Sequence, residues 1–124
     1  MASQTDEGFV TLTAAGAISR FARVKDNGSG KLVVAVAADG GGVEIGQAER
    51  EAFAADEVIS VRLTNQPGTC KMIAKAAITA FAKVYTDIEG KIGVTGTNKL
   101  VGIAFEAAAA DGDIIEVARA NGEE

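Results

Sequence analysis

Gly28-Ser29-Gly30-Lys31 is the segment that comes nearest to a recognised chemistry, the binding of phosphate by a glycine-rich loop. The complete motif has another glycine five positions before Gly30 and a serine or threonine directly after the lysine. Lys25 and Leu32 stand at those two positions, so the hydroxyl that would hold magnesium is missing. The sequence therefore does not predict nucleotide binding.

The spacing of the acidic residues and the single cysteine do not indicate a metal site. Asp39-Gly40-Gly41-Gly42 and Asp111-Gly112-Asp113 lack the spaced oxygen ligands of a calcium loop, and tight turns explain both segments better. Cys70 is the only cysteine, which excludes an intrachain disulfide and a cysteine-rich metal site. The sequence has no histidine, the commonest general base near neutral pH. We therefore predict no catalytic residue, no metal, no cofactor and no enzymatic activity.

Charge and hydropathy argue against two further classes of partner. The chain has a formal net charge of −5 with dispersed acidic residues, whereas nucleic-acid binding normally needs a basic stripe. No apolar run approaches the length of a membrane span. Met1–Gly8 lacks the basic start and apolar middle of a secretory signal. We expect no nucleic acid and no membrane partner, and synthesis in a cytoplasm.

The elements that must position these residues occur twice in the chain. Ala14–Val34 aligns without gaps on Ala74–Val94, and Gly46–Asn65 aligns on Gly102–Asn121. The first alignment matches Ile18, Phe21, Ala22, Val24, Gly30, Lys31 and Val34 with the identical residues Ile78, Phe81, Ala82, Val84, Gly90, Lys91 and Val94. Two copies are too few for a solenoid. We therefore predict a single domain over residues 9–124 with pseudo-twofold internal symmetry, repeat 1 covering about 9–65 and repeat 2 about 69–121.

Alternation of β-branched and polar residues predicts an all-β fold, a compact β-barrel or sandwich. The expected strands are Phe9–Thr13, Arg20–Lys25, Lys31–Val36, Val43–Ala48, Val58–Leu63, Phe81–Thr86, Lys91–Thr95, Leu100–Phe105 and Ile114–Ala118. Cys70–Val84 also has a helical pattern. Its counterpart Phe9–Val24 carries β-branched residues and Gly16, so two strands joined by a short turn are preferred in both copies.

Alanine content and apolar pattern predict two further features. The alanine-rich segments Ala48–Ala55 and Ala104–Ala110 favour a single helical turn each. The core is expected at equivalent positions of the two repeats, and it should contain Phe21 and Phe81, Val24 and Val84, Ile59 and Ile115, and Val61 and Val117.

Residues 1–8 are polar and small, and they are expected to form a flexible N-terminal arm that becomes ordered on binding. The arm directly precedes the strand expected at Phe9–Thr13. It could therefore add a strand to an exposed sheet edge of a partner.

The second repeat carries a recognisable progression of motifs. Val84-Tyr85-Thr86-Asp87 is followed by Gly90-Lys91, then by Leu100-Val101-Gly102-Ile103-Ala104, and then by Ala107–Ile115 with Val117. This progression resembles the tailed-phage capsid cement, or decoration, proteins, although Thr86 stands where that family often has tryptophan. The resemblance spans roughly Ile45 to Ala118. Some relatives carry a recombinase label, and the incomplete phosphate loop argues against that activity in this chain.

The resemblance implies a structural protein of the virion, located on the exterior of the capsid and made in the host cytoplasm. It would bridge major capsid subunits and stabilise the shell against the pressure of packaged DNA. It also implies a homo-oligomer, with a trimer favoured. The candidate capsid contacts are the residues of the arm, Ala2, Ser3, Gln4, Thr5, Asp6, Glu7 and Gly8.

A rival prediction from another class is a β-barrel module that binds a small ligand or a carbohydrate at its symmetry axis. Carbohydrate sites favour aromatic platforms, whereas this chain has no tryptophan and one tyrosine, Tyr85. A free monomer that binds a metabolite would favour this alternative over the capsid protein.

Overall fold

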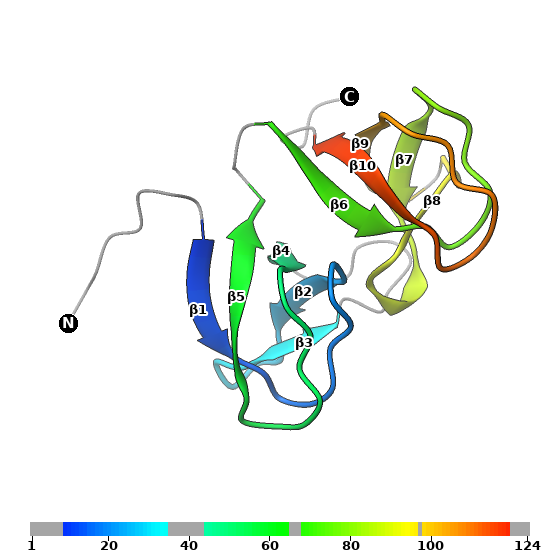
Figure 1. Ribbon diagram of the computed structural model, residues 1–124. Coiled ribbons are helices and arrows are strands. Elements are labelled where there is room, and N and C mark those ends of the chain that lie inside the picture. Colours follow the sequence, from blue (N-terminus) through cyan, green and yellow to red (C-terminus); the bar gives the residue numbers. More distant parts are fainter. Residues whose placement is uncertain (1–8, 35–43, 65–67, 97, 120–124) are drawn as a thin grey trace.

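The computed structural model describes residues 9–34, 44–64, 68–96 and 98–119, which form two five-stranded antiparallel sheets (Figure 1). The first sheet contains β1 (Phe9–Thr13), β2 (Arg23–Asp26), β3 (Leu32–Val34), β4 (Glu44–Ala48) and β5 (Val58–Leu63). The second contains β6 (Thr69–Ile73), β7 (Lys83–Thr86), β8 (Ile92–Gly93), β9 (Leu100–Ala104) and β10 (Ile114–Arg119), with the short 3-10 segment η1 (Ile88–Gly90) between β7 and β8. The predicted all-β fold is confirmed, as a sandwich rather than a closed barrel.

The sequence repeat reappears in the topology of the two sheets. The strand order is β1-β5-β4-β2-β3 in the first sheet and β6-β10-β9-β7-β8 in the second, so each strand has a counterpart in the same place. Isolated bridges also correspond. Ala14 pairs with Leu32 in the first repeat, as Ala74 pairs with Ile92 in the second. Each bridge brings the two edges of its own sheet together at one point, so each sheet curls around its own apolar core.

Gly46 and Gly102 are equivalent positions where neighbouring strands approach too closely for any side chain. A Cβ atom added at Gly46 would lie 1.9 Å from the carbonyl oxygen of Arg62, and one at Gly102 would lie 2.0 Å from that of Ala118. Both contacts are with backbone, which cannot swing aside as a side chain does. Glycine is therefore required at this position in both repeats.

The strand predictions hold best where alternation is cleanest. β1 and β5 have the predicted bounds, and the two strands preferred within Cys70–Val84 are present as β6 and the start of β7. The predicted helical turns in Ala48–Ala55 and Ala104–Ala110 are wrong. Ala52 exchanges backbone hydrogen bonds with Ile18, and Ala108 does so with Ile78, at 2.9 Å between N and O. These long-range backbone pairs override the helical propensity of alanine.

The core prediction is correct for all but one residue. Buried residues include Phe21, Val24, Val84, Ile59, Ile115, Val61 and Val117. Phe81 was predicted to be buried like its counterpart, but its side chain is 73% exposed, whereas that of Phe21 is 8% exposed. The two repeats share a backbone fold, but the two rings have different surroundings. The second repeat packs over Phe21 of the first repeat, whereas no described segment packs over Phe81 in the same way.

Several predicted segments fall outside the described residues. They are the arm at 1–8, the turn at Asp39–Gly42, one end of each of the strands predicted at Lys31–Val36 and Val43–Ala48, and the ends of the two repeats.

Candidate interaction site

Arg23 is the centre of the junction between the two repeats, and it is completely buried. Its Nη1 donates a hydrogen bond to Glu44 Oε1 at 2.9 Å, within the first repeat. Its Nε and Nη2 donate to the backbone carbonyls of Lys91 at 3.1 Å and Asp87 at 2.6 Å, in the second. A buried guanidinium needs such partners because desolvation of an unpaired charge is costly. Arg23 therefore fixes one repeat against the other.

Arg119, at the end of β10, completes this polar junction from the second repeat. It donates through Nη2 to the carboxylate of Glu44 and through Nη1 to Gln47 Oε1, the latter at 3.1 Å. Cys70 lies beside the same group, and burial raises the pKa of its thiol, opposed by Arg119 and Gln47. The thiol donates weakly to the carbonyl of Val117 across 3.6 Å. Cys70 is thus a buried structural residue.

Phe21 forms the apolar part of the junction. It belongs to the core cluster of the first repeat, which Ile73 of the second repeat also joins. The ammonium of Lys71 lies 5.9 Å from the ring centroid, and the guanidinium of Arg20 lies 4.6 Å from it, both within the range of a cation–π contact. β6 therefore covers this ring.

The counterpart surface on the second repeat is not covered by the described part of the chain. We call Phe81, Lys83, Val94, Ile103 and Phe105 the uncovered face. All five residues are exposed, and the Phe81 and Phe105 ring centroids lie 6.1 Å apart. Ile103 and Phe105 stand where the first repeat has Gln47 and Glu49. The uncovered face is therefore more apolar than the junction surface that it mirrors.

Two of the segments considered for phosphate and calcium chemistry, Gly28–Lys31 and Asp111–Asp113, form turns closed by nearby side chains, whereas Asp39–Gly42 lies outside the described residues. Asp26 accepts hydrogen bonds from the backbone N–H groups of Gly28 and Gly30. Lys31 pairs with Asp56 at 2.8 Å between Nζ and Oδ1. Asp113 Oδ2 accepts from two backbone N–H groups, those of Ala109 and Ala110. These side chains stabilise turns, which is the role predicted for the aspartates of 111–113.

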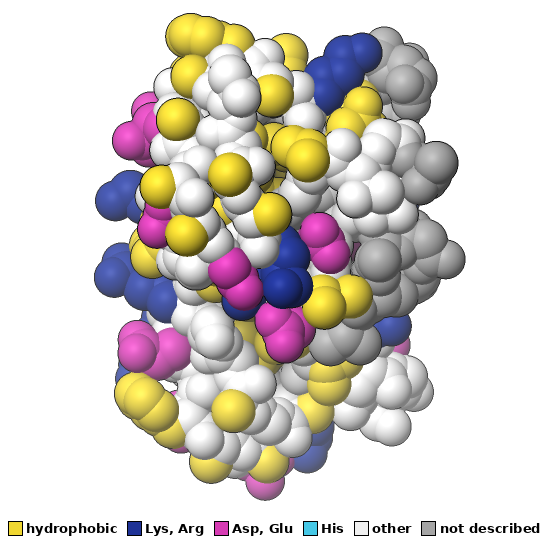
Figure 2. All heavy atoms as spheres, turned by 90° about the vertical axis from the view of Figure 1, so that its right-hand side faces the viewer, with side chains coloured by type: hydrophobic (Ala, Val, Ile, Leu, Met, Phe, Trp, Pro, Cys, Tyr) yellow, Lys and Arg dark blue, Asp and Glu magenta, His cyan; other side chains and the backbone are white. Residues whose placement is uncertain are grey.

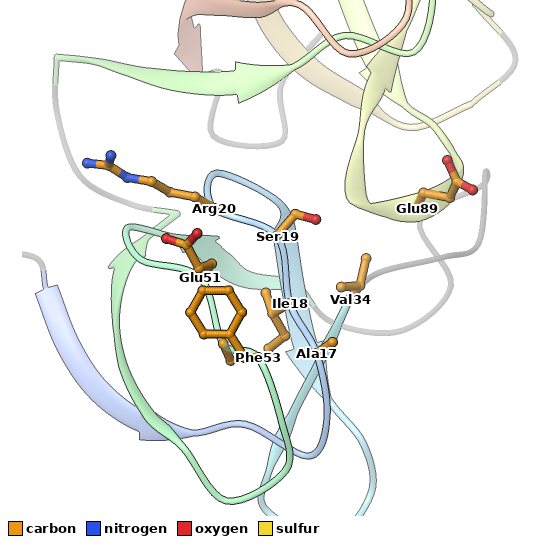
Figure 3. Close-up of a pocket in the computed structure, with 9 residues that line it drawn as sticks. Ala17, Ile18, Ser19, Arg20, Val34, Glu51, Phe53 and Glu89 are labelled. Atoms are coloured by element: carbon orange, nitrogen blue, oxygen red, sulfur yellow. The ribbon is translucent and has the colours of Figure 1, made fainter.

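A shallow, open hollow lies beside the junction (Figure 3). Its lining comes mainly from the segment Ala17–Arg20 and from Phe53, with Val34 at one side. Glu89 reaches it from the second repeat (Figure 3). Phe53 is 77% exposed, so it forms an aromatic rim and not the wall of an enclosed cavity. The hollow is thus partly open to solvent and does not enclose a ligand on all sides.

The face seen in Figure 2 carries hydrophobic side chains in small separate groups, with a compact set of basic and acidic side chains near the middle. Among the ion pairs of the second repeat, Lys91 pairs with Asp111 at 2.8 Å and with Glu89 at 3.3 Å. Lys75 pairs with Asp111 at 3.3 Å. Opposite charges are thus matched locally in this group.

Two classes of site have no candidate in the described segments. No group of three or more cysteine, histidine or acidic side chains there has an arrangement that could hold a metal ion. Within those same segments, no helix has the length and apolar character needed to cross a membrane.

Comparison with known families finds a similarity over the second repeat. Residues 66–119 match the family of phage cement proteins. The matched segment contains the whole second sheet, from β6 to β10. The match covers less than half of the chain, and it agrees with the resemblance that the motifs of the second repeat predicted. No curated protein matches the chain.

The predicted contact residues and the observed candidate surface do not coincide. Ala2–Gly8 lie outside the described residues, so their role as capsid contacts stays a prediction. Sequence reasoning missed the uncovered face because it assumed equal burial in both repeats. A signal was present, since Gln47 and Glu49 are replaced by Ile103 and Phe105 at positions of otherwise similar sequence. A polar-to-apolar change between repeats indicates that the two equivalent surfaces have different surroundings.

Proposed function

We propose that this protein binds the outer surface of a tailed-phage capsid and stabilises it by bridging major capsid subunits. The observation that carries the proposal is the match of residues 66–119 to phage cement proteins, a family whose name describes a capsid-stabilising structural role. The matched unit is a complete sheet, and the first repeat provides a second sheet with the same strand order. One chain thereby offers two similar units, as a bridge between neighbouring subunits requires.

Edge strands supply a means of attachment. β1 and β6 are the first strands of their sheets and lie at the edges. Among the described strands, β1 pairs only with β5, so its other side can accept or extend a strand. The arm of residues 1–8 continues directly from β1. We propose that Ala2–Gly8 pair with backbone of the shell by strand addition, a mode in which main-chain hydrogen bonds give affinity.

The competing proposal, a small-ligand or carbohydrate module, has weaker support. The hollow beside Phe53 is open, whereas ligand pockets enclose most of the ligand surface. Its single aromatic rim residue is a poor substitute for a stacking platform.

Heads prepared without this protein test the capsid proposal. We expect purified full-length protein to bind them and to raise the temperature at which they release DNA. Deletion of Ala2–Glu7 should leave the melting of the free protein nearly unchanged and reduce occupancy on heads. Truncation of residues 121–124 serves as the matched control and should bind like the full chain. Full-length protein that never associates with heads would contradict the capsid role. Undiminished binding of the arm deletion would contradict only the contact role of the arm and would leave the capsid role standing.

A further inference from the structure

The junction between the repeats joins two different surfaces. The first repeat contributes Phe21, Arg23, Val34 and Gln47, and the second contributes β6 together with the turn at 87–91. A Cβ atom added at Gly90 of that turn would lie 2.7 Å from Val34 Cγ1 and 3.0 Å from the carbonyl oxygen of Arg23, which shows how closely the turn packs. Neither contribution contains the counterpart of the other.

Each side of the junction therefore has a free counterpart in the same chain. The counterpart of the Phe21 surface is the uncovered face of the second repeat. The surface that covers Phe21 consists of β6 and the turn at 87–91, and its counterpart in the first repeat is β1 with the turn Asn27–Lys31. All residues of that turn are exposed, whereas Gly90 in the equivalent turn is buried by the junction. The chain presents both halves of a contact that it already makes once internally.

We infer that the uncovered face binds β1 and the Asn27–Lys31 turn of a second copy of this chain, head to tail. The backbones of the two repeats match, so the second copy can dock on the uncovered face as the second repeat docks on the first. The uncovered face is itself more apolar than the internal junction surface, because Ile103 and Phe105 replace Gln47 and Glu49. The exposed rings of Phe81 and Phe105 lie together on this face, so a docking copy would bury a contiguous aromatic surface.

Lys83 extends the correspondence to the polar contacts. It stands at the position of Arg23, which donates to the backbone carbonyls of Asp87 and Lys91. The counterpart carbonyls are those of Asn27 and Lys31 in the docking copy. A lysine ammonium can donate to carbonyls, although it cannot reproduce the fork of a guanidinium. A head-to-tail contact joins two different surfaces of the same chain. Such heterologous contacts close into rings or extend as filaments rather than ending at a twofold dimer.

Sedimentation equilibrium tests the face. The wild type should associate reversibly. The double variant Phe81→Ser with Ile103→Gln should raise the dissociation constant of self-association by at least about tenfold, because both side chains lie at the proposed contact. Its folding is checked by circular dichroism. Phe53→Ser is the matched control, because it removes an exposed aromatic outside both surfaces, and it should associate like the wild type.

Thiol cross-linking tests the orientation and does not depend on removal of either ring. Ser29 and Val94 are the counterparts of Glu89 and Val34, which line one hollow at the internal junction. In a Cys70→Ala background, a mixture of Ser29→Cys and Val94→Cys chains should cross-link with a short reagent, and each chain alone should not. Cross-linking of Val94→Cys chains to one another would show a face-to-face dimer and overturn the inference.

Two other outcomes would also overturn it. The first is a wild type that stays monomeric at every concentration. The second is a double variant that associates normally. If the wild type is monomeric and the double variant no longer binds heads, the uncovered face is a shell contact instead of a contact between copies. That outcome would leave the capsid role standing, so the two proposals fail separately.

Discussion

Phe21 and Phe81 occupy the same position in two repeats, with nearly the same backbone. Both have positive φ, 70° and 68°, and both donate a backbone hydrogen bond to the carbonyl of an equivalent alanine at 2.7 Å. A bulky residue rarely adopts this left-handed conformation. Yet one ring is buried at the junction and the other is exposed. The difference teaches that the backbone of each repeat is set locally, whereas the use of its surface is set by what packs against it.

Arg23 and its counterpart Lys83 should give the largest contrast between the repeats. Arg23→Leu removes the donor to two backbone carbonyls at the junction and one of the two donors to Glu44, so we expect a loss of about 3–5 kcal/mol in unfolding free energy. Lys83→Leu changes an exposed residue and should shift stability by no more than about 0.5 kcal/mol. Urea denaturation measures both. Equal losses would show that the junction does not depend on Arg23.

The two phenylalanines should differ nearly as much. Phe21→Ala removes a buried ring and should cost about 3 kcal/mol, the lower end for such truncations. Phe81→Ala should change stability by less than about 1 kcal/mol, because its ring is mostly in solvent. Thermal melts of the two variants make the comparison. A Phe81→Ala variant as unstable as Phe21→Ala would place that ring in a core after all.

Gly46 and Gly102 should show where the repeats behave alike. Alanine at either position forces the neighbouring strand to move, since its Cβ would overlap backbone. We expect each substitution to cost about 2–3 kcal/mol, the upper part of the range for overpacking. Gly16→Ala is the control, because a Cβ there meets no atom within 4 Å. A large effect at only one of the two glycines would show that the two sheets are not equivalent where these neighbouring strands approach.

The smallest effect concerns the ion pairs that follow the turn of each repeat. A hydrogen bond from Lys91 lowers the pKa of Asp111 below its ordinary value of 3.8, and the same contact raises the pKa of Lys91 above 10.5. The stabilisation from Asp111 is therefore present above about pH 3.8 and is lost as the pH falls through its lowered pKa. That from Lys91 is present below pH 10.5 and is lost as the pH rises through its raised pKa.

Asp111→Asn should remove this acid-side dependence and slightly lower the melting temperature at neutral pH. Asp56→Asn, which breaks the ion pair to Lys31 in the first repeat, should have a smaller effect. The Lys31 side chain is 46% exposed, against 20% for Lys91, so solvent screens its pair more. Melting temperatures recorded across a pH series provide the measurement. A larger effect from Asp56→Asn would reverse the ranking of the two pairs.

Local pattern was sufficient to predict most of the fold. β1 and β5 alternate clearly between apolar and polar residues, and the repeat itself decided between a helix and two strands at Cys70–Val84. The alanine-rich segments could not be predicted in this way. Ala52 and Ala108 take part in backbone bridges to residues far away in sequence, and no local propensity encodes such a partner.

Prediction of the interaction surface was limited by the same physics. The pattern around Phe81 is that of a core residue, because its copy in the first repeat is one. Burial of that copy depends on Ile73 and Lys71, which approach from the other sheet. Comparison of the repeats at Ile103 and Phe105 would have revealed the exposed apolar surface. The contact role of Ala2–Gly8 remains a prediction from sequence.

Electron cryo-microscopy of heads assembled with and without this protein tests the central claim most directly. The account predicts added density on the outer surface where major capsid subunits meet, with two sheet-sized lobes for each chain. Where copies touch, the lobe of the second repeat should face the first repeat of the next copy. Heads that look the same in both preparations, or protein found only inside the shell, would contradict the account.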